Sequence, residues 1–112
     1  MESPKVSILI LSYNAPRYVH TTLKSLQKTD YDNYEVIVFD NNSRLITKLV
    51  NLYALSKGWI SRLIFSPKNI LFSPGNNEAF KSISADSKFT VLLNSDIQIK
   101  DKDWLKKLID LH

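Results

Sequence analysis

The stretch VSILILSYN, residues 6–14, decides the fold. Its first six residues are rich in Ile, Leu and Val, a pattern typical of a strand that is covered on both faces. The polar residues Ser12, Tyr13 and Asn14 end this strand. Asn14 can cap a helix and Pro16 is tolerated in a first helical turn, so a helix is expected to follow at once.

The same order of strand, polar turn and helix recurs along the rest of the chain. Strands are predicted at residues 6–11, 35–39, 62–65 and 90–94. Apolar residues at helical spacing predict helices that begin near Pro16, Leu45, Gly75 and Trp104. In the second of these helices, the expected apolar face consists of Leu45, Leu49 and Leu52 with Ile46, Val50 and Tyr53. In the third, the expected buried residues are Ala79, Phe80 and Ile83.

This alternation predicts an α/β fold with right-handed crossovers, a Rossmann-like parallel sheet in the strand order 3-2-1-4. In that order the first strand lies beside the fourth. The polar clusters 12–14 and 94–96 then face one crevice at the carboxyl edge of the sheet, with cluster 40–43 next to them. In open α/β sheets this edge, near the point where the strand order reverses, is where ligands bind.

Composition narrows the kind of protein and the kind of ligand. The 112 residues fit one domain, 1–112, and 44% of them are hydrophobic. The absence of cysteine excludes thiolate metal sites and fits a reducing cytoplasm, and no apolar run is long enough to span a membrane. The net charge of +4 is dispersed along the chain, which does not favour a nucleic-acid partner.

Two common phosphate-binding devices are excluded by the glycine count. With only Gly58 and Gly75, the chain has neither a G-x-G-x-x-G turn nor a phosphate loop that ends in Gly-Lys. A phosphorylated ligand would therefore need another source of positive charge. Asp96, with Asn94 two residues before it, offers oxygen ligands of the kind that Mg²⁺ prefers when it bridges a carboxylate to phosphates.

At four places the sequence resembles family 2 inverting glycosyltransferases of the GT-A fold. The matching segments are VSILILSYN, YEVIVFDNNS, SPKNILFSPGNNEAFKSI and FTVLLNSDIQI followed by WL, in the order and spacing of the N-terminal, nucleotide-sugar-binding half of those enzymes. The N-x-D form of the last segment is similar to that of the rhamnosyltransferase-like members. The resemblance implies transfer of a sugar, with inversion, from a UDP- or dTDP-sugar to a hydroxyl of a glycan or lipid-linked acceptor.

The resemblance also implies roles for individual residues. Asp40 would accept a hydrogen bond from the nucleotide base, and Ser12, Tyr13 and Asn14 would line the nucleotide pocket, with Tyr13 against base or ribose. Asn94 would lie near the ribose or diphosphate, and Asp96 would hold Mg²⁺ or Mn²⁺ against the diphosphate. Asn69 and Asn77 would shape a loop behind the pocket. Leu71 stands where the family often has glycine, which implies a different path for that loop.

Further expectations concern the whole enzyme. The catalytic base and the acceptor-binding half of the family lie beyond the last residue of this chain, so the chain is expected to be inactive alone. The resemblance further implies polysaccharide biosynthesis in the cytoplasm, with peripheral membrane association of the full-length protein as an option.

Simpler interpretations exist for each of these residues. Asp40 can be a turn or helix-cap carboxylate, the Asn94–Asp96 segment can be a turn that only redirects the strand, and Tyr13 can be an aromatic residue at the edge of the core. At the level of the whole chain, the alternative to a glycosyltransferase is a non-enzymatic doubly wound binding or interaction module.

Overall fold

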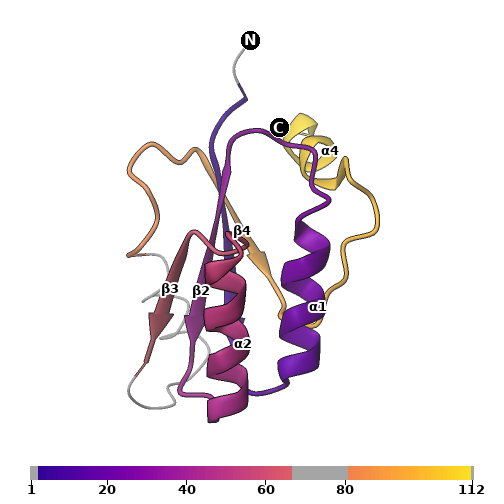
Figure 1. Cartoon of the computed structure of the whole chain (residues 1–112). Helices are drawn as coiled ribbons and strands as arrows, with labels where there is room; N and C mark the ends of the chain where they lie inside the picture. Colours follow the sequence, from indigo (N-terminus) through magenta and orange to yellow (C-terminus); the bar gives the residue numbers. More distant parts are fainter. Residues whose placement is uncertain (1–2, 67–80, 112) are drawn as a thin grey trace.

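A computed structural model describes residues 3–66 and 81–111 of the chain. Four strands form one parallel sheet in the order β3-β2-β1-β4, as predicted. They are β1 (Val6–Ser12), β2 (Tyr34–Asp40), β3 (Arg62–Phe65) and β4 (Phe89–Leu93). Their carboxyl ends point to one edge, the lower edge in Figure 1.

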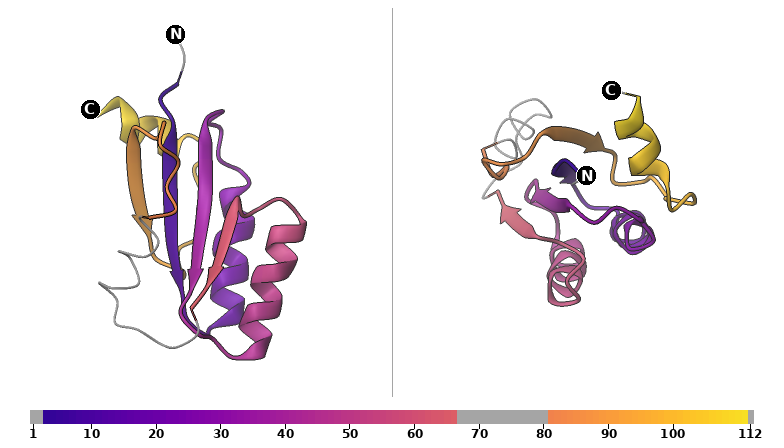
Figure 2. Two further views of the ribbon diagram at one scale, coloured as in Figure 1. Left: turned by 90° about the vertical axis from the view of Figure 1, so that its left-hand side faces the viewer. Right: turned by 90° about the horizontal axis from the view of Figure 1, so that it is seen from above.

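Helices α1 (Pro16–Leu26) and α2 (Leu45–Ser56) lie side by side on one face of the sheet (Figures 1 and 2). The last helix, α4 (Trp104–Asp110), packs at the β4 side of the same layer. The first, second and last predicted helices are thus confirmed. The loop residues Asn69, Leu71 and Asn77, the predicted buried residues Ala79 and Phe80 and the start of the helix predicted from Gly75 lie outside the described residues. Ile83, the last buried residue predicted for that helix, lies in a bend and not in a helix.

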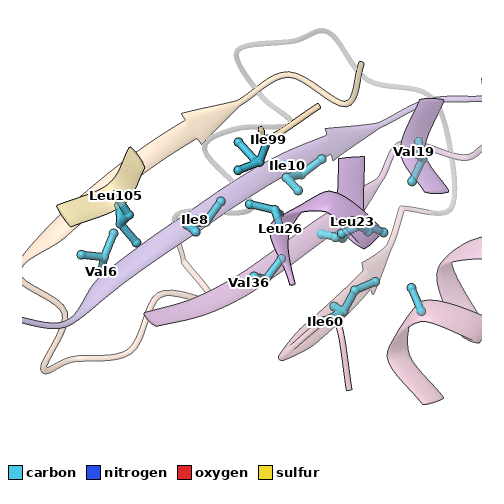
Figure 3. Packing of buried hydrophobic residues seen from close by; sticks show 12 residues of the cluster. Val6, Ile8, Ile10, Val19, Leu23, Leu26, Val36, Ile60, Ile99 and Leu105 are labelled. Carbon is cyan, nitrogen blue, oxygen red and sulfur yellow. The ribbon is translucent and has the colours of Figure 1, made fainter. Parts of the chain in front are cut away.

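The main core lies between the sheet and these helices. Side chains alternate along each strand, so Val6, Ile8 and Ile10 of β1 face the helices while Leu9 and Leu11 face the other way. Figure 3 shows Ile8 and Ile10 beside Leu23, Leu26 and Val36. A smaller cluster on the opposite face contains Leu9, Ile37 and Phe39, and Ile83 packs against it.

Helix α2 differs from its prediction in the direction of its apolar face. Its buried residues are Thr47, Asn51 and Ala54, which follow helical spacing. The predicted apolar face is turned outward: Leu45 is 68% exposed, Leu49 53% and Leu52 45%. The prediction of an amphipathic helix was correct, but its apolar face is not the buried one. Two stripes of the same helix have helical periodicity, and periodicity alone does not choose which of them is buried.

Candidate functional site

A crevice opens at the carboxyl edge of the sheet, where β1 and β4 are neighbours. Its volume is about 520 Å³, and its lining includes Tyr13, Tyr18, Leu92, Asn94 and Asp96. The predicted crevice between the ends of the first and fourth strands is therefore present. Of the cluster 12–14, however, only Tyr13 is among its lining residues. Apolar walls with a few polar groups at one end are the usual composition of a small-molecule site.

The strand β4 stops because the chain turns sharply after Leu93. The N–H of Ile97 donates to the carbonyl of Asn94 (3.4 Å), which closes a turn over residues 94–97. Two side chains of α1 fix this segment. Thr22 Oγ1 donates to the Ser95 carbonyl (2.8 Å), and Ser25 Oγ accepts from the N–H of Ile99 (2.8 Å). Ile99 itself is buried in the core. The anchored turn leaves Asn94 and Asp96 at the surface of the crevice.

The residues present fit a divalent cation that is shared with a ligand. Asn94 and Asp96 are both exposed and supply one amide and one carboxylate group at the same place. Among the described residues there is no cluster of three or more His, Cys, Asp or Glu side chains that could hold an ion by themselves. Mg²⁺ takes one or two protein carboxylates and fills its other positions with water and phosphate oxygens, so one carboxylate at an open crevice is consistent with this mode.

Asp40 and Ser12 lie at the same edge but belong to a buried network under α2. Both are fully buried, and they are paired in register across β1 and β2. Asp40 Oδ1 accepts from Ser12 Oγ (3.5 Å) and from Asn51 Nδ2 (3.4 Å), while Asp40 Oδ2 accepts from the N–H of Ser43 (3.1 Å). Asn51 Nδ2 also donates to Ser12 Oγ (3.2 Å). This carboxylate therefore fixes the turn after β2, as in the simpler interpretation, and it has no accessible surface for a ligand in this arrangement.

Asn14 joins the two loops that follow β1 and β2. It does not cap α1, whose N-cap residue is Ala15, so that part of the prediction was wrong. Instead, its Oδ1 accepts from the N–H of Arg44 (2.9 Å), and its own N–H donates to Ser43 Oγ (2.8 Å). Asn14 has φ 52° and Ala15 has φ 53°. Two successive left-handed residues turn the chain sharply from β1 into α1, which places Tyr13 in the crevice.

Several residues that position the site were not predicted from the sequence. Asn51 lies within a leucine-rich helix, and its helical spacing from Thr47 and Ala54 is visible in the sequence but does not show that this stripe is the buried one. Thr22 and Ser25 are polar residues on the buried side of α1, three residues apart, and this pattern is the signal that they bind neighbouring backbone. Tyr18, which is 62% exposed and lines the crevice, gave no signal.

Comparisons with known proteins agree with this geometry. A family model described as glycosyl transferase family 2 matches residues 7–112. An uncharacterized glycosyltransferase of Haemophilus influenzae is 27% identical over 107 residues, which are 95% of this chain and 32% of that protein. The GalNAc(5)-diNAcBac-PP-undecaprenol beta-1,3-glucosyltransferase of Campylobacter jejuni is 28% identical over 96 residues, 86% of this chain and 31% of that protein. The chain thus spans about a third of the length of these relatives.

Solved structures of glycosyltransferases share the fold. The mannosyltransferase PcManGT of Pyrobaculum calidifontis, in complex with GDP-Man and Mn²⁺, has a TM-score of 0.88 at 18% identity and covers 97% of this chain and 32% of its own. The S. aureus protein TarS, in complex with UDP-GlcNAc, has a TM-score of 0.76 at 24% identity and covers 95% of this chain and 30% of its own. The family model matches residues 7–112, which are nearly the whole of this chain. The chain therefore belongs to glycosyltransferase family 2.

Proposed function

We propose that this chain is the N-terminal, donor-binding part of a longer glycosyltransferase that acts in polysaccharide biosynthesis. The whole enzyme would transfer a sugar, with inversion, from a UDP- or dTDP-sugar to a hydroxyl of a glycan or lipid-linked acceptor. The observation that carries the proposal is the crevice between β1 and β4, which brings Tyr13, Asn94 and Asp96 together within a glycosyltransferase family 2 domain. The N-x-D form at 94–96 supports assignment to the rhamnosyltransferase-like subgroup.

Within the crevice, we assign the diphosphate to the end that contains Asn94 and Asp96. A bare diphosphate would repel the Asp96 carboxylate, so the two would bind together only through a cation. Asp96, with Asn94, would hold Mg²⁺ or Mn²⁺ there, and the bound ion would offset the charge on the nucleoside diphosphate as it leaves. Tyr13, which also lines the crevice, would pack against the base or ribose, and its 49% exposure leaves its ring accessible.

We propose that three residues outside the lining of the crevice also act on the nucleotide: Ser12, Asn14 and Asp40. Their hydrogen bonds fix the two loops from which Tyr13 projects, and the base contact assigned to Asp40 requires that its carboxylate exchange an internal partner for the base. Catalysis also needs a base that deprotonates the acceptor hydroxyl, which we place outside these residues. The chain alone should therefore bind the donor without efficient transfer.

The experiment is calorimetric titration of UDP and dTDP, each with and without Mn²⁺. We expect positive coupling of about 1–3 kcal/mol between nucleotide and metal, equal in both directions. Asp96→Asn should abolish the coupling without loss of fold, and Asp40→Asn should weaken nucleotide binding but preserve the coupling. Asp110→Asn, an exposed carboxylate on α4, is the matched control. Unchanged metal dependence in Asp96→Asn would show that the 94–97 segment is only a turn.

A further inference from the structure

Helix α2 is amphipathic in the reverse of the usual sense. A helix on the surface of a soluble domain normally buries its apolar stripe and exposes its polar one. Here the stripe that faces the sheet is Thr47, Asn51 and Ala54, and large apolar side chains are exposed on the outside. These are Leu45, Ile46, Leu49, Leu52 and Tyr53, with exposed fractions of 68%, 66%, 53%, 45% and 50%. Such a concentration of exposed apolar side chains on one element indicates a surface that is covered by something else in use.

In the two segments that carry α1 and α2, every charged side chain is basic. Residues 12–29 and 41–66, which contain α1 and α2 with their flanking loops, include no Asp or Glu. The basic residues there that are exposed outright are Arg17, Lys24, Lys28, Arg44 and Lys57. Between these two segments, the acidic residue at the carboxyl edge of the sheet is Asp40, and it is fully buried under α2. The surface therefore combines apolar area with a positive field that no exposed acid within these two segments offsets.

The two helices that carry most of these groups are neighbours. They lie side by side on the same face of the sheet (Figures 1 and 2). A shallow groove between them is lined by Pro16, Arg17 and Thr21 of α1 and by Ile46 and Val50 of α2. We call this surface the α1/α2 face; it consists of Leu45, Ile46, Leu49, Leu52 and Tyr53 with the basic residues Arg17, Lys24, Arg44, Lys48 and Lys57.

We propose that the α1/α2 face docks on an anionic lipid bilayer. Apolar residues flanked by Lys and Arg are the composition of helices that lie in the membrane interface, where the side chains enter the boundary of the acyl chains and the cations meet lipid phosphates. No helix in the described part of the chain is long and apolar enough to cross a membrane. This deepens the peripheral membrane association expected of the full-length protein, but it uses none of the residues assigned to the donor crevice.

The charge pattern favours a bilayer over a second copy of the chain. In a symmetric dimer through this face, the cations of one copy would lie against those of the other, and like charges in an interface oppose association. A surface of anionic lipid removes this conflict. The position is compatible with donor binding. Leu9 and Leu11 line the crevice and face away from the helices, so docking through α1 and α2 leaves the crevice uncovered.

The test is flotation of the 112-residue chain with vesicles of phosphatidylcholine alone and of phosphatidylcholine mixed with phosphatidylglycerol. We expect binding to the anionic vesicles, weakened by salt. Leu49→Ser with Leu52→Ser should lower the partition coefficient about tenfold or more. Lys48→Gln with Lys57→Gln should lower it by about tenfold, on the anionic vesicles only. The control pair is Lys106→Gln with Leu111→Ser at α4, where both residues are exposed, and it should bind as the parent chain does.

Each outcome decides for or against the proposal. Equal binding to neutral and anionic vesicles, no binding to either, or an equal loss in the control pair would overturn it. Sedimentation of the chain without lipid supplies a further test, since a dimer that Leu49→Ser dissociates would assign the face to a second copy. Circular dichroism of each variant checks that the fold is kept. Nucleotide titration of the same variants separates the two proposals, because the α1/α2 variants should bind UDP and Mn²⁺ as the parent chain does.

Discussion

Replacement of Glu35 by glutamine removes a buried charge at the opposite end of the sheet from the crevice. Glu35 is 5% exposed and lies on β2 facing away from the helices. Its Oε2 accepts from Ser7 Oγ (2.5 Å) and from the N–H of Ser84 (3.0 Å), while its Oε1 accepts from Ser84 Oγ (2.7 Å) and from the guanidinium of Arg62. Ser84 lies in the segment that leads into β4, so this cluster fastens the start of the strand that ends at the proposed metal site.

The size of the effect follows from the pKa of Glu35. Burial alone would raise this pKa, but the hydrogen bonds from Ser7, from Ser84 and from Arg62 together lower it from 4.5 to about 2. Because each pKa unit corresponds to about 1.36 kcal/mol, the ionised group stabilises the folded state by roughly 3 kcal/mol relative to its neutral form. Arg62 has a 41% exposed side chain, so solvent screens its share. We therefore expect Glu35→Gln to lower the free energy of unfolding by about 2 kcal/mol at neutral pH.

The pH dependence has a definite sign. Since the pKa of Glu35 is lower in the folded chain than in the unfolded chain, its stabilisation is complete above about 4.5 and is lost as the pH falls through about 2. The difference in stability between the parent chain and Glu35→Gln should shrink over that window. Urea denaturation at a series of pH values measures it, with Asp86→Asn as the control. The Asp86 side chain is 74% exposed and pairs with Lys5 at 3.3 Å, so this ion pair should contribute less than about 1 kcal/mol. A difference that stays constant across the window, or a Glu35→Gln variant as stable as the control, would refute the reasoning.

Three further changes test how the site is held. Gly58 follows α2 with φ 80°, and an added Cβ would have no atom within 4 Å, so Gly58→Ala should cost only the left-handed backbone penalty of about 1 kcal/mol, as measured by thermal unfolding. Thr22→Val keeps the shape but removes the donor to the Ser95 carbonyl; it should cost about 1 kcal/mol in stability and reduce the coupling between nucleotide and Mn²⁺ in calorimetry. Asn51→Asp places a second carboxylate against buried Asp40 and should destabilise the chain by roughly 3 kcal/mol at neutral pH, with recovery on acidification that a neutral replacement such as Asn51→Ala would lack.

The order of the sheet could be predicted because its strands leave little ambiguity. Strands β1 and β2 are buried on both faces, so they appear in the sequence as runs of Val, Ile and Leu that end in polar turns, and right-handed crossovers then allow few strand orders. The crevice was predictable for the same reason, since it follows from the order of the strands and from polar residues at their ends. The direction of α2 was not, because a stripe of Thr47, Asn51 and Ala54 gives no hydrophobic signal and only tertiary contacts select it.

To predict the roles of Ser12 and Asp40, it is necessary to know which face of the sheet the helices cover. Each stands two residues after a core residue of its strand, Ile10 or Val38, and period-two alternation places them on the same face as those residues. The sequence therefore predicts that both side chains point to the same face of the sheet. It does not predict which face the helices cover, and so it could not distinguish a carboxylate in a nucleotide pocket from one buried beneath a helix.

The hydrogen bonds at the carboxyl edge fix the loops around the crevice and leave one lining residue, Asp96, outside this network. The loops after β1 and β2 are joined through Asn14, Ser43 and Arg44, and the turn after β4 is joined to α1 through Thr22 and Ser25. Because α1 begins in the first of these loops, both walls of the crevice are connected to one helix. A nucleotide would enter without much rearrangement of these walls, and only the base contact assigned to Asp40 would require a change in the buried hydrogen bonds behind them. Asp96 is the exception, since its carboxylate is exposed and no side chain in the described part of the chain fixes it within this network. Coupling between nucleotide and metal should then arise mainly from charge, through Asp96, and a trivalent ion such as Tb³⁺ should couple to the nucleotide more strongly than Mn²⁺ does.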